Sequence, residues 1–265
     1  MKKPSVSTFA RRKASGEKLV MVTAYDAPAA RIAAEAGIDI LLVGDSVAMT
    51  TLGLPNTLPM TMAEMLHHAK AVRRGAPGSF VVFDMPFMSY QADTAEALRN
   101  AARALKEAGA DAVKLEGGAE QCPLVEKLVS SGIPVMAHTG LMPQHVQALG
   151  GYKVAGRTEE EAARLVSDAK SLEEAGAFSI VLECVPAALG KQITDALTIP
   201  TIGIGSGPGC SGQVQVLHDM LGLGGDFLPR HAKRYADLGG AAREALARYA
   251  NEVKTGKFPE ENNSF

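Results

Sequence analysis

The stretch ADAVKLEGGAEQCPLVEKLVSSGIPVMAHTG, residues 110–140, contains the pattern that decides the fold. A short apolar run, Ala112 to Glu116, precedes a stretch with helical periodicity, Ala119 to Ser130, and a second apolar run, Pro134 to His138, follows it. Short apolar runs that alternate with longer helical stretches are typical of β-α-β units on a parallel sheet. We therefore predict a strand, a helix and a strand over these three ranges.

The same alternation continues along the whole chain of 265 residues. The apolar runs predict strands at Leu19 to Ala24, Ile38 to Gly44, Phe80 to Asp84, Ala112 to Glu116, Pro134 to His138, Ser179 to Glu183, Thr201 to Ile204 and Gln213 to His218. The stretches between them predict helices at Ala27 to Ala36, Met62 to Arg74, Thr94 to Ala108, Ala119 to Ser130, Thr158 to Ala175 and Pro186 to Leu197. Eight such strands could form an open doubly wound sheet or a closed TIM-type (β/α)8 barrel. The strand count and the chain length together favour the barrel.

Two features depart from a regular barrel. Only a stretch rich in Gly and Pro, residues 205–212, separates the seventh and eighth runs, so we predict an irregular seventh unit. Arg230 to Thr255 lies outside the eight units and carries apolar residues at helical spacing. We expect one barrel domain over residues 1–265 with extra helices at both ends, in which 230–265 form a C-terminal helical extension. The apolar stripe of this extension could pack on its own barrel or on a neighbouring subunit.

Charge and hydropathy exclude several classes of protein. The 27 Lys and Arg residues nearly balance the 29 Asp and Glu residues, for a net charge of −2, which argues against nucleic acid as a partner. No apolar run approaches the roughly 20 residues that span a bilayer, and no apolar stretch follows the N-terminal Lys residues as in a secretory signal. The three cysteines lack the paired spacing of metal sites. We expect a cytoplasmic protein that does not bind membranes.

Ionisable residues stand at the ends of several predicted strands, where a sheet covered on both faces should be apolar. Because the carboxyl ends of barrel strands converge on one face, where barrel enzymes have their active sites, we expect these side chains to lie close together. Lys114 and Glu116 are two positions apart in one strand, so both point into the barrel. The residues at these strand ends are Asp45, Asp84, Lys114, Glu116, His138 and Glu183.

A cluster of this kind needs a cation. A single Asp at a strand end is often only a turn residue or a helix cap, and a single buried His is often structural. Three carboxylates together, from Asp45, Asp84 and Glu116, would repel one another unless a cation lay between them. Oxygen ligands without cysteine favour Mg²⁺ over zinc, and we therefore predict a Mg²⁺ site at these three residues.

This constellation suits chemistry on an α-keto acid. A Mg²⁺ with few protein ligands can be chelated by the carboxylate and the keto oxygen of such a substrate. Loss of a proton from the adjacent carbon then builds negative charge on an oxygen that Mg²⁺ stabilises, and Lys114 reinforces the effect. Glu183 comes from the sixth strand, across the mouth of the barrel from the metal carboxylates, and is the candidate base.

Nine ordered blocks over essentially the whole chain resemble the ketopantoate hydroxymethyltransferase family. They include Val-Gly-Asp45-Ser46, Phe83-Asp84-Met-Pro-Phe, Val-Lys114-Leu-Glu116-Gly-Gly, Ala-His138-Thr-Gly-Leu and Leu-Glu183-Cys-Val-Pro. The resemblance implies a Mg²⁺-dependent (β/α)8 barrel of pantothenate and coenzyme A biosynthesis. It also implies transfer of a hydroxymethyl group from 5,10-methylenetetrahydrofolate to α-ketoisovalerate (3-methyl-2-oxobutanoate) through a Mg²⁺-stabilised enolate. The family assembles as a homo-oligomer, typically a decamer.

The resemblance also implies a role for each matching residue. Asp45 and Asp84 resemble metal ligands that also contact the substrate, and Glu116 completes the metal site directly or through water. Glu183 resembles the group that accepts the proton from C3 of the keto acid. The remaining substrate contacts would come from Ser46, Lys114 and His138.

Two other functions compete with this interpretation. One is a Mg²⁺-dependent lyase or mutase of the phosphoenolpyruvate or isocitrate lyase-like barrels, which should carry a cysteine-bearing catalytic loop after the fourth or fifth strand. The sequences that follow Glu116 and His138 contain no such motif. The other is a barrel scaffold without catalysis, which should lack some member of the metal, lysine and base set, whereas this chain has every member.

Overall fold

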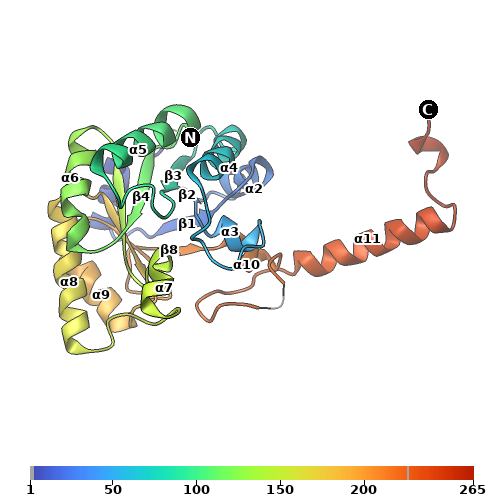
Figure 1. Ribbon diagram of the computed structural model, residues 1–265. Helices are drawn as coiled ribbons and strands as arrows, with labels where there is room; N and C mark the ends of the chain where they lie inside the picture. The colour runs from blue at the N-terminus through green and yellow to red at the C-terminus, as the bar shows by residue number, and fades with distance from the viewer. Residues whose placement is uncertain (1–2, 226) are drawn as a thin grey trace. The chain divides into compact units, whose positions relative to one another are not determined.

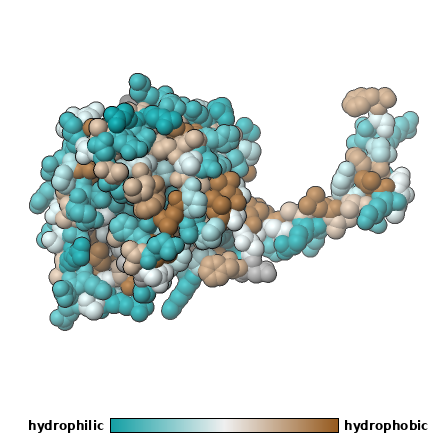
Figure 2. Space-filling model, in the orientation of Figure 1, coloured by the Kyte–Doolittle hydropathy of each residue, from teal (hydrophilic) through white to brown (hydrophobic). Residues whose placement is uncertain are grey.

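The computed structural model describes residues 3–225 and 227–265. These residues form two compact units, of which one ends at Gln215 and the other begins at Val216. In the described part of the first unit, eight parallel strands pair in sequence order and close into a barrel, with helices around it (Figure 1). This arrangement confirms the predicted (β/α)8 fold. In Figure 2 polar residues dominate the visible surface of the unit, as expected when amphipathic helices turn their apolar faces to the sheet.

The structure sets the bounds of each element. The strands are β1 (Leu19–Thr23), β2 (Ile40–Val43), β3 (Phe80–Asp84), β4 (Ala112–Glu116), β5 (Val135–Gly140), β6 (Ser179–Glu183), β7 (Thr201–Ile204) and β8 (Gly212–Gln215). The helices of the first unit are α1 (Val6–Ala14), α2 (Ala27–Glu35), α3 (Val47–Thr50), α4 (Met62–Gly75), α5 (Thr94–Ala108), η1 (Ala119–Gln121), α6 (Cys122–Ser130), η2 (Pro143–His145), α7 (Val146–Leu149), α8 (Glu159–Glu174) and α9 (Ala187–Ala196). The second unit contains α10 (Leu217–Leu221), α11 (Leu238–Lys254) and η3 (Glu261–Asn263). Among the described residues, no helix is long and apolar enough to cross a membrane.

The eighth strand differs from its prediction. The sequence predicted a strand from Gln213 to His218, but β8 ends at Gln215, and Leu217 and His218 already belong to α10. The prediction was wrong at this end because alternating polar and apolar residues continue past the point where the chain turns into a helix. The irregular seventh unit is confirmed, since no helix lies between β7 and β8 in this described stretch.

Helix ends follow the local chemistry of the sequence. Thr158 caps α8 in a capping box with Glu161, so each residue's side chain satisfies a backbone N–H of the other. Asp26 caps α2, and its Oδ1 accepts a hydrogen bond of 2.7 Å from the backbone N–H of Ala29. Gly109 ends α5 with a φ of 68°, a left-handed conformation that glycine adopts without steric cost.

The predicted extra N-terminal helix is α1, which packs at the amino ends of the strands. Phe9 of α1 is fully buried, and its ring lies 4.9 Å from that of Phe80, the first residue of β3, and 6.3 Å from that of Phe178, which precedes β6. The ammonium of Lys13 donates to three backbone carbonyls at and after the C-terminus of α9, those of Thr194, Leu197 and Ile199, at 2.7–2.9 Å. Helix α1 therefore covers the amino ends of the strands, and the carboxyl ends lie at the opposite end of the barrel.

The second unit contains the C-terminal extension. The sequence predicted a helix from Arg230 to Thr255, but α11 begins only at Leu238, where the side chain of Asp237 caps it by accepting a hydrogen bond of 2.9 Å from the N–H of Gly240. The prediction was wrong for residues 230–237 because apolar spacing alone does not show where a cap starts a helix. The apolar side chains of this stripe are exposed, and α11 has no buried residue. Packing of this stripe on its own barrel and packing on a neighbouring subunit both stay predictions. The assignment of the whole chain to a single domain also stays a prediction.

Candidate active site

The carboxyl ends of β2 to β6 bring the predicted residues together inside the first unit. Strand register places Asp84 beside Lys114 and Glu116 beside His138. Glu183 is the last residue of β6 and pairs with Gly140 of β5. All of the ionisable residues predicted at the strand ends are buried except Glu183, whose side chain is 15% exposed.

Lys114 is the central cation of this cluster. Its Nζ lies 2.6 Å from Oδ1 of Asp84 and 3.9 Å from Oε1 of Glu116. Burial alone would lower the pKa of Lys114, but the carboxylates of Asp84, Glu116 and Asp45 outweigh burial and raise the pKa above its ordinary value. Lys114 is therefore a permanent positive charge, not a base.

Asp45 lies directly beside Asp84. The backbone N–H of Asp45 donates a hydrogen bond of 3.3 Å to Oδ2 of Asp84. Burial, together with the negative charges of Asp84 and Glu116, raises the pKa of Asp45 well above its ordinary value. The protein alone therefore does not compensate the negative charge at Asp45 fully.

His138 connects two carboxylates. Its Nδ1 lies 3.4 Å from Oε1 of Glu116, and its Nε2 lies 3.3 Å from Oε2 of Glu183. Burial and the charge of Lys114 lower the pKa of His138, but Glu116 and Glu183 outweigh them and raise it to about 9. The imidazole thus lies between two carboxylates and the ammonium of Lys114, whose Nζ is 3.3 Å from Nδ1. Glu116 Oε1 and His138 Nε2 are nonetheless buried without a hydrogen bond from the described residues, so these contacts are ionic and long.

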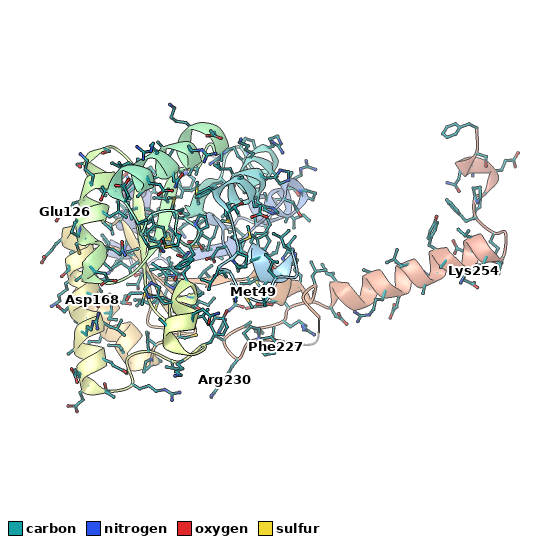
Figure 3. All side chains as sticks on the ribbon, in the orientation of Figure 1. Met49, Glu126, Asp168, Phe227, Arg230 and Lys254 are labelled. Atoms are coloured by element: carbon teal, nitrogen blue, oxygen red, sulfur yellow. The ribbon has the colours of Figure 1, made fainter. Side chains whose placement is uncertain are left out.

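Ser46, the predicted substrate contact that follows Asp45, is half-buried at the edge of the cluster. Its hydroxyl lies 2.8 Å from that of Tyr25, a buried residue that follows β1. The rim beyond it contains Met49, labelled in Figure 3, whose Sδ accepts a contact of 3.8 Å from the hydroxyl of Tyr152. The mouth of the barrel thus combines buried charge with an exposed, partly apolar edge.

Two buried residues of this site were missed by the sequence reasoning. Gln144 belongs to η2, after β5, and Tyr90 lies between β3 and α5. The Nε2 of Gln144 lies 3.0 Å from Oδ2 of Asp45, and its backbone N–H lies 3.0 Å from Oε2 of Glu116. The only signal in the sequence was their place in loops that follow barrel strands, because neither residue is ionised near neutral pH or stands at a strand end.

The donor set fits a hard divalent cation. Three carboxylates, from Asp45, Asp84 and Glu116, lie around the single ammonium of Lys114, and burial raises the pKa of both Asp45 and Asp84, so a further positive charge would stabilise their ionised forms. Among residues 3–225 and 227–265, no group of three or more His, Cys, Asp or Glu side chains is arranged to hold a metal ion. Mg²⁺ commonly binds through one or two carboxylates and completes its six-fold shell with water and substrate, so Asp45 and Asp84 suffice as ligands. Metal binding by these residues, and the part of Glu116 in it, stay predictions.

Comparisons with a protein-family model and with individual relatives identify the same family. The family model described as ketopantoate hydroxymethyltransferase matches residues 3–261. A 3-methyl-2-oxobutanoate hydroxymethyltransferase from Carboxydothermus hydrogenoformans is 58% identical over 265 residues, which cover 100% of this chain and 96% of the relative. One from Thermus thermophilus is 55% identical over 254 residues, which cover 96% of this chain and 97% of the relative.

Solved structures share the fold at much lower identity. A phosphoenolpyruvate phosphomutase from Streptomyces platensis subsp. rosaceus aligns with a TM-score of 0.62 and 16% identity, and covers 96% of this chain and 88% of its own. A 2,3-dimethylmalate lyase of the PEP mutase/isocitrate lyase superfamily aligns with a TM-score of 0.59 and 17% identity, over 98% of this chain and 91% of its own. At these identities the likeness extends to the barrel alone.

Proposed function

This chain belongs to the ketopantoate hydroxymethyltransferase family and is a transferase, and on that premise we propose that it forms ketopantoate from α-ketoisovalerate and 5,10-methylenetetrahydrofolate. The product would serve pantothenate and coenzyme A synthesis. The observation that carries the proposal is the buried cluster at the carboxyl end of the barrel, where Lys114 lies among three carboxylates and Glu183 faces His138 at 3.3 Å. It brings together carboxylates that can hold a divalent cation, a fixed ammonium and a carboxylate base in one place.

Cation binding belongs to this proposal. Asp45 and Asp84 would hold Mg²⁺, and Glu116 would contribute directly or through a water molecule. When bound, Mg²⁺ would supply the charge that polarises the keto group and makes proton loss from the adjacent carbon easier. Lys114 adds a second fixed positive charge at that position, and because it is already paired with Asp84 it needs no reorganisation during the reaction.

Glu183 would remove the proton from C3 of the keto acid. Its carboxylate is partly exposed, so it can meet a substrate at the mouth, whereas the carboxylates of Asp84 and Glu116 are enclosed. His138 is buried beside Glu183, and its Nε2, 3.3 Å from Oε2 of Glu183, would hold that carboxylate in place. Ser46 and His138 would provide further contacts to the substrate.

The new carbon–carbon bond needs no nucleophile from the protein. After C3 loses its proton to Glu183, its electron pair forms a bond to the methylene carbon that the folate carries. Over the whole transfer both bonds from that carbon to the two folate nitrogens break: one is replaced by the bond to C3 and the other by a bond to the oxygen of water, and the two nitrogens take up the proton from C3 and one proton from water. Water supplies the hydroxyl oxygen, because the methylene group carries none. The proposal also includes a homo-oligomer, a decamer by family resemblance, and a cytoplasmic location without nucleic acid or membrane partners.

Turnover tests the proposal. The purified protein is incubated with α-ketoisovalerate, 5,10-methylenetetrahydrofolate and Mg²⁺, and ketopantoate is measured by mass spectrometry. We expect product with Mg²⁺ and none after EDTA treatment. Absence of product with all components would refute the transferase proposal, and full activity in EDTA would refute the cation site. Turnover of a phosphoenolpyruvate-type or isocitrate-type acid instead would support the lyase or mutase alternative.

A further inference from the structure

Gln144 reaches from η2 into the centre of the acidic cluster. The residue is 2% exposed, although it lies on a loop. The two hydrogens of its Nε2 point to two acceptors, Oδ2 of Asp45 at 3.0 Å and the backbone carbonyl of Met85 at 2.9 Å. Asp45 is 99 positions away in the sequence, so this contact joins the loop after β5 to the residues that follow β2.

The oxygen of the Gln144 amide also makes two hydrogen bonds. Its Oε1 accepts a hydrogen bond of 2.8 Å from the hydroxyl of Tyr90 and one of 3.1 Å from Nε2 of Gln91. The amide of Gln144 therefore uses both of its donors and both lone pairs of its acceptor. A reversed amide would set donors against donors and acceptors against acceptors, so the network fixes which end faces Asp45.

The same network holds Glu116. The backbone N–H of Gln144 donates to Oε2 of Glu116 at 3.0 Å, and the backbone N–H of Glu116 donates to the hydroxyl oxygen of Tyr90 at 3.1 Å. Both residues are buried, and the hydroxyl of Tyr90 in turn contacts the amide of Gln144. Gln144 is thus in direct contact with two of the three carboxylates of the predicted cation site.

A neutral donor suits this position for a physical reason. A buried carboxylate needs hydrogen bonds to stay ionised and to keep one orientation. An ammonium or guanidinium beside Asp45 would supply them but would also compete with a metal cation for its charge. The amide of Gln144 holds one oxygen of the carboxylate without adding a positive charge that a metal cation would have to displace.

We propose that Gln144 is a positioning residue of the cation site, which orients the carboxylate of Asp45 for Mg²⁺ and ties it to Glu116. The inference rests on the proposed function, because it assigns a role toward the same cation. Tyr90 does not contact Asp45 in this network; it donates a hydrogen bond to Oε1 of Gln144 and so holds the amide in its orientation. Residues that orient metal ligands typically change metal affinity by about 10- to 100-fold when they are replaced.

Calorimetric titration of the substrate-free protein with MgCl₂ tests the inference without relying on activity. Gln144→Met keeps the length of the side chain and removes its hydrogen bonds, and we expect it to weaken Mg²⁺ binding by about 10- to 100-fold. Tyr90→Phe should weaken binding less, and the double variant should bind about as Gln144→Met does, because both changes act through one amide. Gln147→Leu, on the exposed surface of α7, is the matched control and should bind as the wild type does.

The outcomes separate the inference from the proposed function. If the wild type forms ketopantoate with Mg²⁺, and both Gln144→Met and Tyr90→Phe bind Mg²⁺ within twofold of the wild type, the positioning role is wrong and the transferase proposal stands. If the wild type neither binds Mg²⁺ nor forms ketopantoate, the proposed function itself is wrong, and the positioning role with it. Circular dichroism spectra and melting curves in EDTA check that each variant is folded.

Discussion

The Nζ of Lys114 lies 2.6 Å from Oδ1 of Asp84, and the two side chains are only 5% and 3% exposed. A buried ion pair of this kind gains little net stability by itself, because both charges lose their hydration. Its surroundings explain why it is present. Asp45 and Glu116 lie in the same volume, so Lys114 is a fixed counter-charge for a set of carboxylates. In the proposed function, a second cation would balance the rest of their charge.

Removal of Lys114 should therefore destabilise the protein strongly. In Lys114→Met the buried carboxylate of Asp84 loses its partner, and we expect the free energy of unfolding in EDTA to fall by about 3–5 kcal/mol. Urea unfolding followed by circular dichroism measures the change. Lys106→Met, on the exposed face of α5, is the control and should change the free energy of unfolding by no more than about 0.5 kcal/mol. An equally small change in Lys114→Met would show that the ion pair does not compensate the cluster.

Asp84→Ala should weaken Mg²⁺ binding sharply. The substitution removes a carboxylate that we predict to bind the metal directly. It also removes the nearest partner of the Lys114 ammonium, which would then compete with the cation for Glu116. Titration calorimetry with MgCl₂ measures the affinity of the variant and the wild type. An unchanged titration curve would remove Asp84 from the metal ligands.

The stability of the barrel should depend on pH through Glu173, which lies far from the site. Burial raises the pKa of Glu173, but hydrogen bonds from the hydroxyl and N–H of Thr198 and from the N–H of Ile199, at 2.6–2.9 Å, outweigh burial and lower it. A carboxyl group whose pKa is lower in the folded protein contributes stability above its unfolded pKa and loses that contribution as pH falls through the folded value. Glu173→Gln should therefore cost stability at pH 7 and much less at about pH 3.

Urea unfolding of the wild type and of Glu173→Gln across this pH range checks the expectation. A difference in unfolding free energy that stays constant with pH would mean that the charge of Glu173 contributes nothing, because the glutamine keeps an oxygen that can accept the same hydrogen bonds.

Cys184 should be a poor nucleophile although it follows the candidate base. Burial and the charge of Glu183 raise the pKa of the Cys184 thiol to about 11. Because only the thiolate reacts, alkylation by iodoacetamide should be very slow at pH 7 and should accelerate about tenfold for each pH unit until the pH approaches that value. Mass spectrometry of the peptide that contains Cys184 measures the rate. Rapid alkylation at pH 7 would contradict the raised pKa.

Much of the architecture was predictable because its signals are periodic. The alternation of apolar runs with helical stretches predicts the barrel, and a barrel necessarily gathers the ends of β2 to β6 on one face. The spacing of Lys114 and Glu116 by two positions predicts that both point inward, and the structure places them beside Asp84 and His138. These inferences need only the period of a strand and the closure of a sheet.

The remaining features depend on the path of loops, which no periodicity sets. Gln144 and Tyr90 contact the acidic cluster because the loops after β5 and β3 fold back over the strand ends. The end of β8 and the start of α11 were misplaced for a related reason, since a local turn and the cap at Asp237 decide those boundaries. Sequence patterns thus predicted the charged residues of the buried cluster but not the neutral residues, Gln144 and Tyr90, that contact them.

Exchange of the C3 proton of α-ketoisovalerate tests the central claim most directly. The substrate is incubated in deuterated water without folate, and the C3 proton signal is followed by nuclear magnetic resonance. We expect the wild type to exchange this proton with Mg²⁺ but not with EDTA, and Glu183→Gln to exchange it about 10²- to 10⁴-fold more slowly while it still binds Mg²⁺. Exchange by Glu183→Gln at the wild-type rate, or by the wild type in EDTA, would contradict the account.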